Sequence, residues 1–253
     1  MTRTIFILFT LLLARISFSK TADSTQTSST FSGTIGITTN GFSIIPTFSL
    51  NSPAAIINLS WQKKRFSFDP DIRLVSNASK GGLLFWSRYR LIDRKKFSLR
   101  VGAHPALSLI RKQVLDDGIN IEITEALRFV AFEVVPNYQI TENWGLGAMY
   151  LEGHGLQKHG PQTTRVLFLS TSLTNLKLSP KFRCHFIPTI YFLNTDGFTG
   201  SYLTATSILA HQQIPFSFQA TINQTFVSDI PGNQDFMWNI TLNYSFKRKI
   251  IRG

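Results

Sequence analysis

The sequence contains a single cysteine, Cys184, among its 253 residues. One thiol cannot form a disulfide within the chain, and it supplies only one of the ligands that a cysteine-based metal site needs. A scaffold held by internal disulfides and a multi-cysteine zinc site are therefore excluded. We expect no metal site and no cofactor.

Long apolar runs are also missing after the first twenty residues. A transmembrane helix needs about 20 consecutive apolar residues, so a mature chain that spans a membrane must do so with β-strands. Charged residues make up only 16% of the chain, whereas soluble domains contain about 25%. Phenylalanine is abundant, with 22 copies, which favours a protein with a large apolar surface.

The few charged residues are mostly basic, and the formal net charge is +12. Such a surplus can serve nucleic-acid binding. Here, however, the basic residues are spread among aromatic strands and short turns, form no basic helix and match no nucleic-acid motif. We therefore expect no nucleic-acid partner.

The N-terminus is typical of a secretory signal peptide over residues 1–19. Arg3 provides the positive start, Ile5–Leu13 the apolar core, and Ser17 and Ser19 the small residues before a cleavage site. A Ser/Thr-rich lead-in follows at 20–29. We assign residues 30–246 to one domain and residues 247–253 to a basic tail.

From Thr30 onward, apolar and polar residues alternate, which is the pattern of β-strands with two unlike faces. The sequence predicts twelve strands: Thr30–Thr39, Ala54–Gln62, Arg65–Val75, Gly82–Leu91, Phe97–Ile110, Ile121–Ile140, Trp144–Gly153, Thr164–Thr174, Leu178–Leu193, Phe198–Ala210, Phe216–Val227 and Asp235–Phe246. Phe42–Leu50 also alternates, but it contains Pro46 and is bounded by Asn51 and Pro53. It belongs to a loop, folds into the mouth of the domain, or is one of two further strands in a fourteen-stranded alternative.

The last strand shows the alternation most clearly. One face is apolar and half aromatic, whereas the other face is polar except at Met237. In a membrane barrel the apolar face contacts lipid and the polar face lines the lumen. We therefore predict lipid contact for Phe236, Trp238, Ile240, Leu242, Tyr244 and Phe246.

The connections between the predicted strands fall into two classes. One end of the domain receives short turns such as Lys63-Lys64 and Thr141–Asn143, and the other receives longer segments rich in Gly, Asn, Asp and Pro. Bacterial outer-membrane barrels have an even number of strands, short periplasmic turns and longer outer loops. The last strand would then run toward the periplasm and pair with Thr30–Thr39.

With its signal peptide, even strand count and aromatic-ended closing strand, the chain resembles an outer-membrane β-barrel of Gram-negative bacteria, similar in plan to porins. The resemblance is to the class and rests on no family-specific motif. It implies a closed all-β up-and-down antiparallel barrel of twelve strands in the outer membrane. It also implies outer-membrane lipids, and the barrel-assembly machinery during biogenesis, as partners. Lys247–Gly253 departs from the class, in which the closing strand usually ends the chain.

Several charged residues fall on the predicted inner face, and they suggest what the lumen does. With five arginines, one lysine and two histidines against three carboxylates, they predict a cationic zone: Asp69, Asp71, Arg73, Arg88, Arg90, Arg100, His104, Glu133, Lys181, Arg183 and His185. They could line a narrow porin-like channel that favours small anionic solutes, as in twelve-stranded porins for acidic sugars. Alternatively, they could pair with one another in a closed structural or anchoring barrel.

A third possibility is a lipid-modifying hydrolase of the outer membrane, which would use Ser and His. None of the five histidines stands in a serine motif, and Gly-x-Ser-x-Gly is missing. His154 and His159, with Glu152 nearby, supply too few ligands for a metal. We therefore predict no catalytic residues and no enzyme activity.

Three basic clusters occupy the short-turn end: Lys63-Lys64-Arg65, Arg94-Lys95-Lys96 and Lys247-Arg248-Lys249. They could be solvated turns. They could equally contact anionic lipid headgroups of the inner leaflet or a periplasmic partner.

Overall fold

The computed structural model describes residues 28–45, 48–116 and 119–251. The predicted signal peptide and most of the lead-in lie outside this range. The described residues form twelve strands: β1 (Ser28–Thr38), β2 (Ala54–Lys63), β3 (Phe66–Val75), β4 (Gly81–Asp93), β5 (Phe97–Asp116), β6 (Ile119–Gln139), β7 (Trp144–Gly155), β8 (Thr163–Lys177), β9 (Phe182–Thr195), β10 (Phe198–His211), β11 (Phe216–Ser228) and β12 (Phe236–Ile251). None of the described residues belongs to a helix that could cross a membrane.

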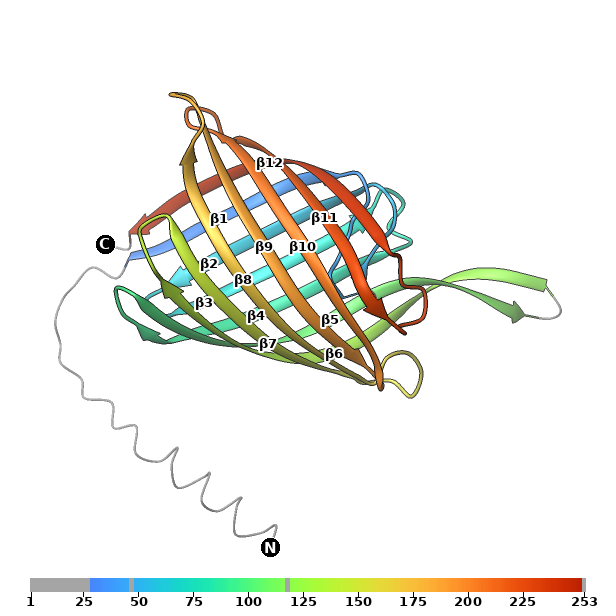
Figure 1. The fold of residues 1–253 in the computed structure, drawn as a ribbon. Coiled ribbons are helices and arrows are strands. Elements are labelled where there is room, and N and C mark those ends of the chain that lie inside the picture. Colours follow the sequence, from blue (N-terminus) through green and yellow to red (C-terminus); the bar gives the residue numbers. More distant parts are fainter. Residues whose placement is uncertain (1–27, 46–47, 117–118, 252–253) are drawn as a thin grey trace, which may run out of the picture. The chain divides into compact units, whose positions relative to one another are not determined.

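The strands close into one antiparallel barrel (Figure 1). Each strand pairs with the next in sequence, and β12 pairs with β1. Within the barrel wall, closure gives each described strand a partner on both sides, which a bilayer requires. The predicted fold class and strand number are thus confirmed, and the fourteen-stranded alternative is not.

Strand alternation sorts the side chains into an inner and an outer set. Directly paired residues share a face: Asn58 of β2 lies opposite Asp71 of β3, and Trp61 lies opposite Phe68. The first pair lines a cavity inside the barrel, whereas Trp61 is exposed on the outside. Because the side-chain period is two, this register fixes the direction of the remaining residues in each strand.

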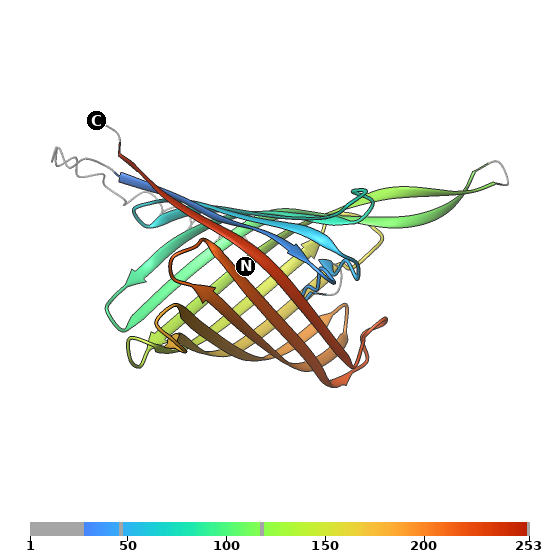
Figure 2. The same cartoon turned by 90° about the horizontal axis from the view of Figure 1, so that it is seen from above.

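The β5–β6 hairpin is longer than the sequence predicted. We expected a loop over Lys112–Asn120, but the ladder continues to the pair Asp116 and Ile119. Apolar residues with high strand propensity, such as Val114 and Ile121, favour the extension. Ion pairs between Arg111 and Glu122 and between Lys112 and Glu125 join the two strands. The hairpin projects beyond the neighbouring strands (Figure 2).

Two strand ends also differ from the prediction. β9 begins at Phe182 rather than at Leu178, because residues 178–181 form the turn. β12 continues to Ile251 rather than ending at Phe246, so most of the expected tail belongs to the barrel. The start of β1 at Ser28 provides the partner for this extra length.

The connections remain unequal at the two ends. The end where β1 begins and β12 ends has short turns at 64–65, 94–96, 140–143, 178–181 and 212–215. The opposite end carries the longer connections at 39–53, 156–162 and 229–235, together with the projecting hairpin. The short-turn end therefore corresponds to the periplasmic side of a bacterial barrel.

Candidate functional site

The connection between β1 and β2 folds into the barrel instead of extending from it. We call residues 40–45 and 48–53 the mouth segment. Phe48 is buried against Phe129, with ring centroids 5.7 Å apart, and Leu50 is buried beside Ala54 and Val75. The described part of Phe42–Leu50, whose place the sequence left open, thus lies inside the barrel and narrows the lumen.

Hydrogen bonds hold the mouth segment at its base. The Leu50 amide donates to the Gly41 carbonyl, and the Ser43 amide donates to Oγ of Ser49. Gly41 has a φ of +55°, and a Cβ there would lie 2.8 Å from Cβ of Leu50. Glycine at this position therefore allows the chain to turn inward. The Asn40 amide ties the segment to Oδ1 of Asn239 on β12.

The mouth segment divides the lumen into two cavities. The inner chamber, about 770 Å³, extends toward the short-turn end. The outer chamber, about 440 Å³, lies among the long connections and is lined by residues such as Pro161 and Ile230. Phe42, Ser43 and Ile44 line both cavities. Any solute that crosses the barrel must pass these side chains.

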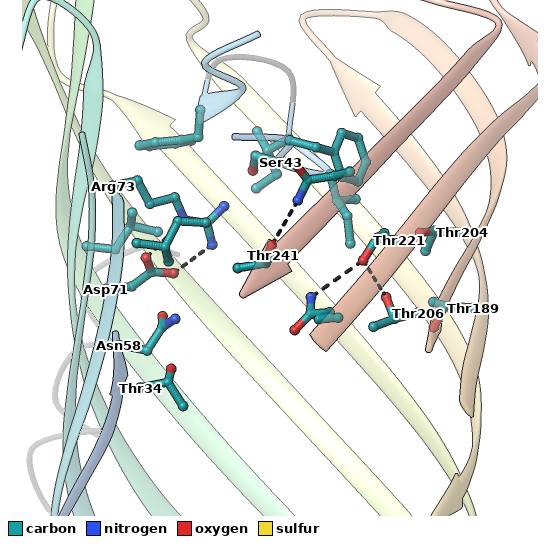
Figure 3. A pocket seen from close by; sticks show the side chains of 18 of the residues that line it. Thr34, Ser43, Asn58, Asp71, Arg73, Thr189, Thr204, Thr206, Thr221 and Thr241 are labelled. Atoms are coloured by element: carbon teal, nitrogen blue, oxygen red, sulfur yellow. Dashed lines mark hydrogen bonds and ion pairs between the residues drawn. The ribbon is translucent and has the colours of Figure 1, made fainter. Parts of the chain in front are cut away.

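The inner chamber has two unlike walls. Strands β4 to β8 contribute apolar side chains, among them Leu84, Trp86, Phe129, Met149, Leu151 and Phe168. Strands β9 to β12 and β1 contribute hydroxyl and amide groups, among them Thr34, Thr189, Thr204, Thr206, Gln219, Thr221, Thr241 and Asn243. Figure 3 shows Thr189, Thr204, Thr206 and Thr221 across the chamber from Arg73 and Asp71, whereas Thr34 lies on the same side as Asp71.

Hydrogen bonds link the groups of the polar wall. Oγ1 atoms of Thr206 and Thr221 are 3.1 Å apart, and Nδ2 of Asn239 donates to Oγ1 of Thr241 at 3.2 Å. The Thr241 hydroxyl in turn donates to Thr38 on β1 at 3.1 Å. Linked side chains keep a defined arrangement. The predicted polar face of the closing strand, with Asn239, Thr241 and Asn243, lines this wall as expected. The sequence prediction did not single out the threonines of β9 and β10.

The predicted inner-face charges of β3 to β6 meet at Arg88. Nη1 of Arg88 lies 3.0 Å from Oδ2 of Asp69, and Nε lies 2.8 Å from Oε1 of Glu133. The guanidinium carbon is 4.3 Å from the centre of the Trp86 ring. Trp86 also contacts the buried His104, with ring centroids 3.8 Å apart. Arg88 is therefore fixed by two carboxylates and an aromatic face.

The other arginines of this wall are also paired. Arg73 donates twice to Asp71, at 2.9 and 2.7 Å, and Nε of Arg100 lies 3.3 Å from Oε1 of Glu133. Three arginines thus face three carboxylates, counting Arg88 and Asp69, and their formal charges cancel. The cationic zone that we predicted is therefore neutralised at these three arginines.

The remaining predicted residues lie closer to the short-turn end. Arg90 pairs with Asp93 at 2.8 Å, and it faces Arg100 across the ladder. Lys181 lies in the turn before β9, and Arg183 lies opposite Lys177. His185 lines the inner chamber and accepts a hydrogen bond from the Asn175 amide. The structure therefore does not bring these β9 residues together with the arginines of β3 to β6.

The closing strand presents its aromatic face to the outside. The side chains of Phe236, Trp238, Ile240, Leu242 and Tyr244 are 42–54% exposed in the isolated chain. Phe246 contacts Phe31 of β1 on the same face. Asn239 and Thr241 are buried inside. Trp238 is thus not covered by a second sheet.

The described residues contain no group of three or more His, Cys, Asp or Glu side chains that could hold a metal ion. The histidines have other partners. His104 contacts the Pro105 carbonyl, His154 and His159 contact Glu152 and Glu125, and the His211 ring accepts from the Gln213 amide.

Comparisons with known proteins agree with the fold. The structure resembles the KdgM porin with a TM-score of 0.53 and 10% identity, over 85% of this chain and 99% of that one. It resembles the COG4313 outer membrane channel of Pseudomonas putida F1 with a TM-score of 0.52 and 12% identity, over 88% and 97%. No family model and no curated protein matches the sequence.

At these identities the likeness concerns the fold. Both neighbours are outer-membrane barrels by their descriptions, and a closed barrel with an apolar outer face is the β-structure that a bilayer accepts. The chain therefore has the fold of the outer-membrane β-barrels, and its location is the bacterial outer membrane.

Proposed function

We propose that the protein is a passive channel for small solutes across the outer membrane. The observation that supports this proposal is the chamber of about 770 Å³ inside the closed barrel, with hydrogen-bonding groups along one wall. A barrel that served only as an anchor would not need an ordered polar wall around open space. The descriptions of the two structural neighbours, a porin and a channel, agree with this proposal.

The two walls of the chamber suggest the class of solute. A solute with an apolar part could contact Trp86 and Phe168, while its hydroxyl or carboxylate groups contact Thr206 and Thr221. Sites with apolar surfaces and a few polar groups orient small ligands in this way. We therefore propose small amphipathic solutes rather than large hydrophilic ones.

A preference for anions remains part of the proposal, but we assign it to other residues. The arginines in the middle of the lumen are compensated, whereas cations in the inward phase cluster at the short-turn rim. Arg183 lies opposite Ala210, which lines the chamber, and Lys247 and Lys249 continue the inward alternation of Asn243 and Ser245. We call Arg183, Lys247 and Lys249 the pore-side cations. Charges at a pore entrance raise the local concentration of counter-ions.

Planar-bilayer recording of the purified protein tests the channel and its selectivity. We expect ohmic steps and a reversal potential that favours chloride over potassium at low salt. Replacing the pore-side cations by glutamine should weaken this preference. The matched control is Lys63→Gln, Lys64→Gln and Arg248→Gln. It also removes three positive charges from this rim, but from residues that point outward or lie in a turn. If the two variants behave alike, the pore-side cations do not set selectivity.

A closed structural barrel is the second candidate. The buried Phe48 and Leu50 and the internal ion pairs favour it. A protein that remains silent in bilayers, while a variant lacking residues 42–49 conducts, would support this candidate over the open channel.

We also propose that the protein is not a hydrolase. This proposal is supported by the backbone and glutamate partners of the histidines described above. Phospholipase and esterase assays of the purified protein in mixed micelles test this proposal, and activity that is lost when the histidines are replaced by glutamine would contradict it.

A further inference from the structure

The positive charge of the described chain is concentrated at one end of the barrel. The short-turn end has thirteen cationic residues: Lys63, Lys64, Arg65, Arg90, Arg94, Lys95, Lys96, Lys177, Lys181, Arg183, Lys247, Arg248 and Lys249. Its acidic residues are Asp93 and Glu142, which leaves a surplus of eleven. At the opposite end, six cations (Lys80, Arg111, Lys112, Arg128, Lys158 and Arg165) are more than balanced by seven acidic residues (Asp116, Glu122, Glu125, Glu152, Asp196, Asp229 and Asp235). The surplus therefore belongs to one rim.

Strand register shows which of these cations face the membrane. Lys63 follows the outward Trp61 at the period of two, and it lies opposite the exposed Phe66. Arg248 follows Tyr244 and Phe246 in the same outward phase of β12. Lys64 lies in the turn after β2, and Arg94-Lys95-Lys96 form the turn after β4. We call Lys63, Lys64, Arg94, Lys95, Lys96 and Arg248 the outer cation ring.

The outer cation ring covers one arc of the barrel. β12, β1, β2, β3, β4 and β5 are consecutive neighbours in the sheet, so the end of β12, the β2–β3 turn and the β4–β5 turn are adjacent. On the other side of the rim, the β6–β7 turn contains Glu142 and no cation, residues 212–215 are uncharged, and the β8–β9 turn contains one cation, Lys181. The rim thus has a strongly basic side and a side with few cations.

Exposed aromatic residues mark the depth of this rim in the bilayer. Trp61, Phe66, Tyr89, Tyr138, Trp144, Phe182, Phe216 and Tyr244 lie close to the short-turn ends of their strands and are 38–47% exposed. Tryptophan and tyrosine prefer the membrane–water interface. Lys63 is two residues beyond Trp61, and Arg248 is four beyond Tyr244, so both reach the level of the lipid phosphates. Their long aliphatic stems allow the charges to extend to that level.

We propose that the outer cation ring binds the headgroups of anionic phospholipids in the periplasm-facing leaflet. The charges are of one sign, and Asp93 is already paired with Arg90, so an external anion is needed to compensate them. Lipid headgroups are the anions that occur at this depth next to outward side chains. The ring would hold anionic lipid along one arc of the barrel, whether or not the lumen conducts.

Fluorescence quenching by brominated lipids can test this arrangement, because tryptophans lie on both sides of the rim. Trp61 is two residues from Lys63, and Trp144 follows the β6–β7 turn without cations. Trp238 is replaced by Phe in all samples, and a second replacement, Trp144→Phe or Trp61→Phe, leaves one outward reporter. Trp86 is buried inside the barrel and out of reach of lipid.

The proteins are reconstituted in vesicles of phosphatidylcholine with brominated phosphatidylglycerol or brominated phosphatidylcholine. At Trp61 we expect quenching to favour phosphatidylglycerol by about fivefold, the effect of one cation close to the surface, or more. At Trp144 we expect quenching by the two lipids to be equal. The preference at Trp61 should decrease with added salt, because salt screens exposed charges.

A charge variant then assigns the effect to the ring. Replacing all six residues of the ring, Lys63, Lys64, Arg94, Lys95, Lys96 and Arg248, by glutamine should abolish the preference at Trp61. Lys80→Gln, Arg128→Gln and Lys158→Gln at the other end should not change it. Heat-modifiable migration on gels checks that each variant is folded. Equal quenching at Trp61 by both lipids, a preference of the same size at Trp144, or a preference that survives the charge variant would overturn the proposal.

Discussion

Arg88 and Glu133 reach one another across a strand that separates them. Arg88 belongs to β4 and Glu133 to β6, and both lie in register with Gly102 of β5. A Cβ on Gly102 would lie 2.9 Å from Cγ of Arg88 and 3.0 Å from Cγ of Glu133. The missing side chain therefore opens the path for the contact between Nε and Oε1 at 2.8 Å.

This relationship predicts the effect of Glu133→Gln. Arg88 and Arg100 both contact the carboxylate of Glu133, which is 1% exposed, so its neutralisation leaves two arginines with less compensation. We expect a loss of about 3 kcal/mol in the free energy of unfolding, as for other broken buried pairs. Urea unfolding in lipid vesicles measures it. Glu142→Gln in an exposed turn is the control and should have little effect.

The glycine itself provides a second prediction. Gly102→Val should separate Arg88 from Glu133, because both side chains occupy the space that the valine needs. The separation exposes the guanidinium and the carboxylate individually to the solute path, so the ion selectivity in bilayers should change. A valine at the outward Ala103 of the same strand is the control. Unchanged selectivity with a folded barrel would show that the pair does not influence the solute path.

The mouth segment predicts a change in conductance. Phe48→Ala removes the ring that anchors the segment against Phe129, so the segment should leave the lumen more often and the mean conductance should rise. Phe48→Leu retains most of the buried volume and should behave like the wild type. Single-channel recordings distinguish the two variants, and equal conductance in both would contradict this role of Phe48.

The polar wall predicts a change in solute preference. Thr206→Val combined with Thr221→Val keeps the shape of the chamber but removes the hydroxyl pair. Liposome-swelling rates should fall for a polyol and change little for an apolar solute of the same size. Thr124→Val on the projecting part of β6 is the matched substitution away from the chamber and should alter neither rate.

A pH dependence is expected at the outer surface, where the 156–162 connection contacts the projecting hairpin. The hydrogen bond from His159 holds the pKa of Glu125 below its usual value. A carboxyl group with a lowered pKa in the folded state stabilises the contact at neutral pH, and this contribution is lost as the pH falls through the folded-state pKa. Hydrogen exchange of residues 156–162 should therefore accelerate in acid.

His159→Gln should remove this pH dependence, because the pKa of Glu125 would return toward its usual value. Gln157 holds the same connection through bonds with the Arg128 amide and the Ala126 carbonyl. Gln157→Ala should therefore accelerate exchange at every pH. If the wild-type connection exchanges at the same rate at neutral and acidic pH, the His159–Glu125 contact does not stabilise it.

Where apolar and polar residues alternate along a strand, the sequence predicted most accurately which face each side chain occupies. The facing of Asp69, Arg88 and Glu133 into the barrel follows from the period of two alone, because a strand has only two faces. The projecting hairpin was missed, since Lys112–Asn120 contains charges and a turn dipeptide that suggested a loop. Its pairing depends on ion pairs between strands, which a single-strand pattern does not display.

The sequence by itself determined a membrane barrel: alternation selected the face of each side chain, and the unequal connections selected the direction of the strands. Only the tertiary structure decided how the lumen is filled. Arg88 is not a free cation because Glu133 lies two strands away, on the other side of Gly102. Whether Phe42–Leu50 extends outward or folds inward depends on the space between distant strands. Both are contacts across the barrel, and they exist only once twelve strands have closed.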